Sequence, residues 1–73
     1  MNTNHYVHLT VAQRELLLDH YDNAAKKLKA DGNRYGQFKA LTRRLELESP
    51  RGVWLSRFEC QIAGIDVDAE MYA

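Results

Sequence analysis

The stretch TVAQRELLLDHYDNAAKKLKADGN, residues 10–33, decides the fold. Thr10 is followed three residues later by Gln13, a capping box in which each side chain bonds a backbone N–H that a helix start leaves open. The stretch ends in Asp31-Gly32-Asn33, a helix stop and turn signal. Between these signals the apolar residues recur at helical spacing: Leu17, Tyr21, Ala24, Ala25 and Leu28, with Leu18 at the edge. The stretch therefore predicts a helix over residues 11–30.

Two further helices are predicted on the C-terminal side. The first runs from about Arg34 to Leu47, and Ser49-Pro50 ends it because Pro disfavours helical geometry in the residue before it. Its apolar stripe consists of Tyr35, Phe38, Leu41 and Leu45. A third helix is predicted to follow this break at Ser49-Pro50, with Gly64 as its C-terminal cap. The apolar spacing behind it is Trp54 or Leu55, Phe58, Ile62 and Ile65. Val53-Trp54-Leu55 also suits a strand, and that alternative stays open.

The two ends of the chain differ from this helical middle. Residues 1–9 are typical of an extended arm, in which the alternation from Tyr6 to Leu9 is compatible with a short strand. Residues 66–73 form an acidic tail that we expect to fray. With a helical core over residues 10–65, the 73 residues predict one small, mainly α domain. We expect a compact bundle of about three short helices with an extended N-terminal arm.

Composition indicates a reducing compartment and no membrane. Cys60 is the one cysteine, so no internal disulfide can form. The opening Met1–His5 has neither the basic nor the apolar region of a signal peptide. No apolar run approaches the roughly 18 residues that a membrane-spanning helix needs. These features favour a cytoplasmic protein.

Charge is unevenly distributed along a chain whose formal net charge is zero. Residues 1–25 carry −2, residues 26–44 carry +6 and residues 45–73 carry −4. The basic residues of the middle segment are Lys26, Lys27, Lys29, Arg34, Lys39, Arg43 and Arg44. At about 100° per residue, Lys39 and Arg43 are predicted to project away from the apolar stripe, and therefore outward. The basic middle predicts either a solvated face or a surface for phosphates or acidic protein patches.

No residue set of an enzyme or metal site stands out. Nucleophilic catalysis needs a nucleophile beside a base, and Cys60 between Phe58 and Ile62 is more typical of a buried structural cysteine. GxGxxG, P-loop and HExxH motifs are absent from the sequence. His5 and His8 lack the second ligand pair of a structural zinc site. We therefore expect no catalytic residues, no metal, no cofactor and no small-molecule substrate.

One pattern suggests a helix-turn-helix DNA reader. Residues 41–45 and 53–58 would be two short helices joined through Ser49-Pro50, with the second helix in the major groove. Glu46 stands where a turn glycine is expected, and the connection is longer than usual. The available base readers are Arg51, Ser56, Arg57 and Gln61. A plain three-helix packing explains the same periodicity.

The opening Met1-Asn2-Thr3-Asn4-His5-Tyr6-Val7-His8 and the region of the first two helices resemble a family of small regulators from lytic Xanthomonas phages. The likeness extends over essentially the whole chain, without a motif that assigns individual contacts. Members of that family bind host RNA polymerase, inhibit transcription initiation and act as antiterminators. The resemblance implies binding at the N-terminal region of the β′ subunit, near the omega subunit and the RNA exit channel, in the cytoplasm of the bacterial host.

Charge and exposure suggest which residues would make such contacts. Tyr6, Val7 and Leu9 of the arm are candidates to dock or to pair with an extended peptide. The seven basic residues of segment 26–44 are candidates to face nascent RNA, elongation factors or acidic polymerase surface. The alternatives are a helix-turn-helix repressor and an inhibitor of a host nuclease complex that acts as a nucleic-acid decoy.

Overall fold

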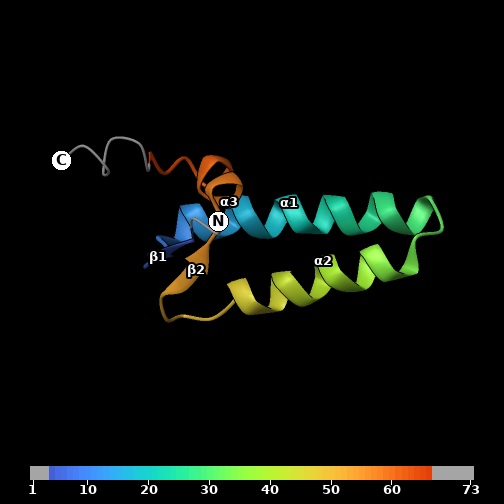
Figure 1. Ribbon diagram of the computed structural model, residues 1–73, viewed down its shortest axis with the longest axis horizontal. Helices are drawn as coiled ribbons and strands as arrows, with labels where there is room; N and C mark the ends of the chain where they lie inside the picture. The colour runs from blue at the N-terminus through green and yellow to red at the C-terminus, as the bar shows by residue number, and fades with distance from the viewer. Residues whose placement is uncertain (1–3, 67–73) are drawn as a thin grey trace.

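Two antiparallel helices, α1 (Val11–Ala30) and α2 (Arg34–Leu47), lie side by side along the long axis of the molecule (Figure 1). This computed structural model describes residues 4–66. Both helices have the bounds that the sequence predicts. The chain is mainly helical, as expected, with a short two-stranded sheet at the end away from the α1–α2 turn. The acidic tail lies outside the described residues apart from Asp66.

The predicted start and turn signals are confirmed in detail. The Thr10 hydroxyl accepts a hydrogen bond from the Gln13 backbone N–H at 3.1 Å, and the Gln13 side chain accepts from the Thr10 N–H at 3.0 Å. At the turn, Gly32 has φ +77°, a left-handed conformation that favours glycine. The Asn33 side chain accepts from the Gly36 N–H at 2.8 Å and begins α2. Local capping therefore fixes this helical hairpin.

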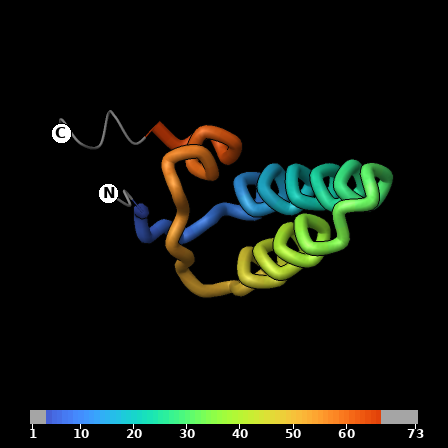
Figure 2. The backbone as a smooth tube through the Cα atoms, turned by 45° about the vertical axis from the view of Figure 1, so that its right-hand side comes forward, coloured from blue at the N-terminus to red at the C-terminus, as the bar shows by residue number. Residues whose placement is uncertain are grey.

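The N-terminal arm is held in a sheet. Strand β1 (His5–Val7) lies beside β2 (Val53–Leu55) (Figure 2). The two strands pair antiparallel, with Tyr6 opposite Trp54. Val53 and Leu55 are buried while Trp54 is exposed, which is the alternation of a half-buried strand. The suggestion of a short strand in the arm is confirmed.

The third predicted helix is wrong in its first part. Residues 53–55 form β2, and helix α3 spans only Arg57–Ile62. Ser56 separates the two, because its side chain caps α3 by accepting from the Glu59 N–H at 3.2 Å. Gly64 follows the helix with φ +75°, as its predicted capping role requires. The strand alternative is therefore correct for Val53–Leu55, and the helix prediction is correct for Arg57–Ile62.

The core lies where the start of α1, the end of α2, the sheet and α3 meet. Its buried members are Leu17, Leu47, Val53, Leu55, Cys60 and Ala63. The predicted stripe of α1 faces this interior, with Leu17 and Ala25 buried and the other members partly buried. Towards the turn, the buried residues of the described helices are the small Ala25 and Ala40. The apolar core is therefore concentrated at one end.

The apolar stripe of α2 faces solvent and not the core. The expected outward position of Arg43 is wrong, because Arg43 lies on the inward side of the helix. Tyr35, Phe38 and Leu45 are 73%, 67% and 67% exposed, and Leu41 is 41% exposed. The helix instead turns Ala40 and Leu47 inward, while the side chain of Arg43 is only 26% exposed. A helical wheel identifies the buried face from hydrophobicity alone, so it does not show that Arg43 pairs with the buried Glu59. We call the four apolar residues the outer stripe of α2.

We predict that Gly52→Ala displaces Tyr6 from the sheet face. A methyl group at Gly52 would lie 2.5 Å from Cζ of Tyr6, whose ring is half exposed and free to swing away. The ring centroids of Tyr6 and Trp54 are 5.3 Å apart, and losing such a contact costs about 1 kcal/mol. Urea unfolding should show this loss, and Trp54 fluorescence should change. In a Tyr6→Ala background the same substitution should be nearly neutral; equal costs in both backgrounds would contradict the prediction.

Candidate partner-binding surfaces

Cys60 and His20 both pack against neighbouring side chains. Cys60 is fully buried in the core, as the sequence analysis expects of a structural cysteine. His20 packs edge-on against Tyr21 and Phe58, with ring centroids 5.0 and 5.6 Å away. Within residues 4–66, no group of three His, Cys, Asp or Glu side chains is placed to hold a metal ion. In the same part of the chain, no helix has the length and apolar character to cross a bilayer.

Arg43 binds inward, to a buried carboxylate. Its Nε and Nη2 donate to the two carboxylate oxygens of Glu59 at 2.7 and 2.9 Å, a bidentate pair. The same carboxylate accepts from the Tyr21 hydroxyl at 2.8 Å and from the Ser56 backbone N–H at 3.0 Å. Arg43 also donates to the Trp54 carbonyl at 2.6 Å and to Glu46 at 2.7 Å. We call the four residues Glu59, Arg43, Tyr21 and Ser56 the Glu59 cluster.

The electrostatics of the Glu59 cluster follow from this geometry. Burial alone raises the pKa of the Glu59 carboxyl, but the hydrogen bonds from Arg43, Ser56 and Tyr21 outweigh burial and lower it to about 2. Burial and the hydrogen bond to Glu59 raise the pKa of Tyr21 to about 12. The hydrogen bond to Glu59 raises the pKa of Arg43 further above its usual value. Over a wide pH range the cluster therefore contains the ionised Glu59 and Arg43 beside the neutral phenol of Tyr21.

Arg44 connects the two long helices. Its Nε lies 2.6 Å from a carboxylate oxygen of Asp22 on α1, and its Nη1 bonds Glu48 on α2. Arg14 provides a second link, since its side chain donates to the carbonyls of Leu47 and Ser49 at 3.2 Å each, where α2 ends. Arg43 and Arg44 are thus paired with acids inside the protein, although the buried Nε of Arg44 lies beside Asp22 without the geometry of a hydrogen bond. The structure separates both arginines from the rest of the predicted basic surface.

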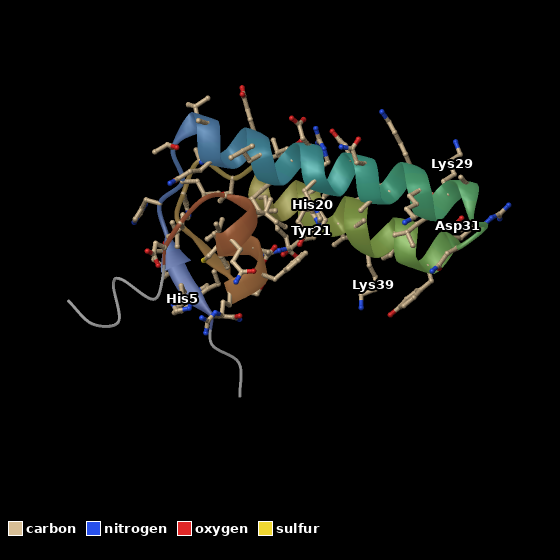
Figure 3. All side chains as sticks on the ribbon, turned by 90° about the horizontal axis from the view of Figure 1, so that it is seen from above. His5, His20, Tyr21, Lys29, Asp31 and Lys39 are labelled. Carbon is tan, nitrogen blue, oxygen red and sulfur yellow. The ribbon has the colours of Figure 1, made fainter. Side chains whose placement is uncertain are left out.

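Five of the predicted basic residues do extend into solvent. They are Lys26, Lys27, Lys29, Arg34 and Lys39. Figure 3 shows Lys29 beside Asp31 at the turn end, while Lys39 extends from the opposite side of the helix pair. Lys39 also lies over the Tyr35 ring, with Nζ 5.6 Å from the ring centroid. The exposed cations therefore surround the turn half of the hairpin on more than one side.

The residues of the arm point to opposite faces of the sheet. Val7 packs against the core, whereas Tyr6 is 51% exposed on the outer face beside Trp54, which is 60% exposed. Leu9, like Val7, packs against the core, so Tyr6 is the accessible one of the three predicted contact residues in the arm. The sequence analysis missed Trp54 as its neighbour, because that pairing depends on a strand formed 48 residues further along the chain.

The outer stripe of α2 is the larger apolar surface. An open hollow of about 270 Å³ runs beside Phe38, lined also by Lys39, Thr42, Arg43 and Glu46. Contiguous exposed apolar side chains with a polar rim are typical of interaction sites. The sequence predicts this stripe as a set of residues, but not that it faces solvent. Glu59 was also missed, although Ser56 and Glu59 have the spacing of a capping box.

Comparisons of the chain with known protein families, with curated proteins and with solved structures gave no match. The functional argument therefore rests on the residues themselves. Its two main observations are the aromatic pair of the sheet face, Tyr6 and Trp54, and the outer stripe of α2. The exposed cations near the turn are the third.

We predict that Glu59→Gln lowers the free energy of unfolding by about 3 kcal/mol at neutral pH, because it leaves Arg43 without its buried counter-charge. The folded pKa of Glu59 is about 2, below its ordinary value of 4.5. Its stabilising contribution is therefore complete above pH 4.5 and is lost as pH falls from 4.5 towards 2. Chemical unfolding followed by circular dichroism should show the two proteins converging over that window.

Glu46→Gln is the matched control, because Glu46 also bonds Arg43 but its side chain is 57% exposed. We expect it to cost less than about 1 kcal/mol. A stability difference between wild type and Glu59→Gln that stays constant from pH 7 to pH 2 would contradict the assignment.

Proposed function

We propose that this chain is a phage-type regulator that binds host bacterial RNA polymerase, inhibits transcription initiation and promotes antitermination. The partner region is the N-terminal part of the β′ subunit, near omega and the RNA exit channel, in the cytoplasm of the bacterial host. The resemblance supplies the identity of this partner. The observation that carries the binding role is the exposed Tyr6–Trp54 pair on an open two-stranded sheet.

Tyr and Trp are enriched among residues that dominate binding energies. Here their rings touch on the outer face of β1 and β2, and each ring is more than half exposed. Each strand has only the other as a partner within the described residues, so each has an outer edge. An extended segment such as a subunit N-terminus is able to add to such an edge through backbone hydrogen bonds. Because β1 already pairs with β2, the added strand would extend this sheet.

The exposed cations support a second contact. Lys26, Lys27, Lys29 and Arg34 lie in the half of the molecule that contains the turn, away from the sheet. A domain with an aromatic contact at one end and cations at the other is suited to bridge a protein segment and a polyanion. Nascent RNA and acidic protein surface are the polyanions near an RNA exit channel.

The helix-turn-helix alternative loses its geometric basis. It requires two helices joined by a turn over residues 41–58, and this segment contains the end of α2, strand β2 and the start of α3. Helix α3 has six residues, and its Glu59 is occupied in the Glu59 cluster. The segment therefore lacks a recognition helix of ordinary length.

We expect the tagged chain to retain RNA polymerase from bacterial lysate at physiological salt, with the subunits identified by mass. Trp54→Ala should reduce retention by roughly tenfold or more, because it removes half of the aromatic pair. Leu16→Ala is the matched control, since Leu16 is also an exposed apolar residue, on α1, with 51% exposure against 60% for Trp54. Absence of polymerase from the wild-type eluate would overturn the proposal. Equal loss in both variants would reject the sheet face as the contact.

Reversing Lys26 and Lys27 to Glu tests the cationic end separately. We expect antitermination on a purified elongation complex to weaken, and its dependence on salt to become shallower, because fewer phosphate contacts remain. Retention of free polymerase should change less than it does in Trp54→Ala. An unchanged salt dependence would assign these lysines to a solvated surface.

A further inference from the structure

The outer stripe of α2 is an amphipathic helix face without a partner in the described chain. Tyr35, Phe38, Leu41 and Leu45 fall within an arc of about 120° around the helix axis, centred opposite the buried Ala40 and Leu47. An exposed helix face is ordinarily polar. An apolar face of this kind indicates that another surface covers it.

Removing water from the centre of this face has a small cost in free energy. Thr42 is the polar residue that lies between Phe38 and Leu45 along it. The Thr42 hydroxyl already donates a hydrogen bond to the Phe38 carbonyl at 2.8 Å. Burial beneath a partner would therefore leave no unpaired donor there, which is the usual penalty for covering a hydroxyl.

The charges beside the stripe have a twofold pattern. Lys39 and Glu46 border it on one flank, and Glu48 borders it on the other, while Arg34 lies in line with the stripe in the first turn of α2. On the first flank the cation lies in the N-terminal half of α2 and the acid in the C-terminal half. These two charges are about 10 Å apart along the axis, at 1.5 Å per residue.

We propose that the outer stripe of α2 binds a second copy of this chain, with the two α2 helices antiparallel about a twofold axis near Leu41 and Thr42. In that arrangement like flanks face each other with their directions reversed. Lys39 of one copy then faces Glu46 of the other, and Glu46 of the first copy faces Lys39 of the second. A parallel pairing would bring Glu46 to the level of the other copy's Glu48, where like charges repel. The charge pattern therefore selects an antiparallel homodimer.

The same axis places apolar side chains opposite one another. Phe38 of one copy lies at the level of Leu45 of the other, and Leu41 lies near the axis. The hollow beside Phe38 provides space for a side chain of the second copy. Glu46 has a partly exposed side chain, 57%, so it is able to accept an intermolecular bond while keeping its internal one.

The size of the face predicts a weak dimer. The 14 residues of α2 span about 21 Å, which gives a contact smaller than the roughly 800 Å² per partner of a standard interface. We therefore expect a dissociation constant on the order of 10–100 μM. This inference does not depend on the polymerase proposal, because self-association is measured with the purified chain alone.

The first experiment is analytical ultracentrifugation of the full chain from roughly 5 to 500 μM, a range that brackets the expected constant. The weight-average mass should rise from monomer to dimer. Phe38→Glu and Leu45→Glu should each weaken association by roughly 30-fold or more, as loss of a central contact does. Leu16→Glu, at an apolar site of similar exposure on α1, is the matched control and should leave association unchanged. Circular dichroism should show all three variants folded, since each site faces solvent.

The second experiment tests the antiparallel arrangement by charge exchange. Lys39→Glu alone and Glu46→Lys alone should each weaken self-association by roughly tenfold, because each creates two repelling pairs in the dimer. An equimolar mixture of these two variants should associate about as well as wild type, since both flank pairs are then opposite in sign. A misfolded variant would not regain association on mixing.

Two outcomes overturn the proposal. One is a monomeric mass at every concentration up to the highest, and the other is a dimer that Phe38→Glu leaves intact. A mixture of the charge variants that associates no better than either variant alone would reject the antiparallel arrangement.

Discussion

The bidentate pair between Arg43 and Glu59 is the interaction on which the rest of the structure depends. Glu59 is buried, yet its carboxylate receives hydrogen bonds from α1 through Tyr21, from α2 through Arg43 and from the cap of α3 through Ser56. A 73-residue chain buries a modest core, so cross-links between its elements matter more than they do in a larger domain. A buried acid is tolerated only when it is paired and hydrogen-bonded, and this one has both kinds of partner.

The orientation of α2 follows from that pair. With Arg43 directed at Glu59 and Arg44 at Asp22, the same helix must present its opposite side to solvent. That side contains Tyr35, Phe38 and Leu45. The apolar stripe is exposed because the two arginines on the other side of α2 pair with acids inside the protein.

Local signals in the sequence predict most of the fold. Both long helices, the Thr10 capping box and the turn at Gly32 depend on residues within four positions of one another. What local patterns cannot show is the direction of Arg43, because its partner Glu59 lies 16 residues away, and Tyr21 lies 38 residues from the same acid. The strand β2 is of the same kind, since it is fixed by pairing with the distant His5–Val7. Hydrophobic periodicity therefore identified the members of the outer stripe while misplacing them.

The candidate binding surfaces also differ in whether local sequence patterns predict them. Tyr6 and five of the seven basic residues are exposed as the sequence suggests, because single exposed positions follow from local polarity and strand alternation. Trp54 and the outward direction of the stripe of α2 required the tertiary arrangement.

The concentration of the core at the sheet end gives the molecule unequal local stability. At the turn end, the α1–α2 contact is buried mainly through Ala25 and Ala40, which have little apolar surface to expose. Partial opening of the hairpin there costs less free energy than opening at Leu17 or Leu47, where whole leucine side chains would meet water. The exposed Lys26, Lys27, Lys29 and Arg34 are thus attached to the half of the protein that opens at the lower cost in free energy.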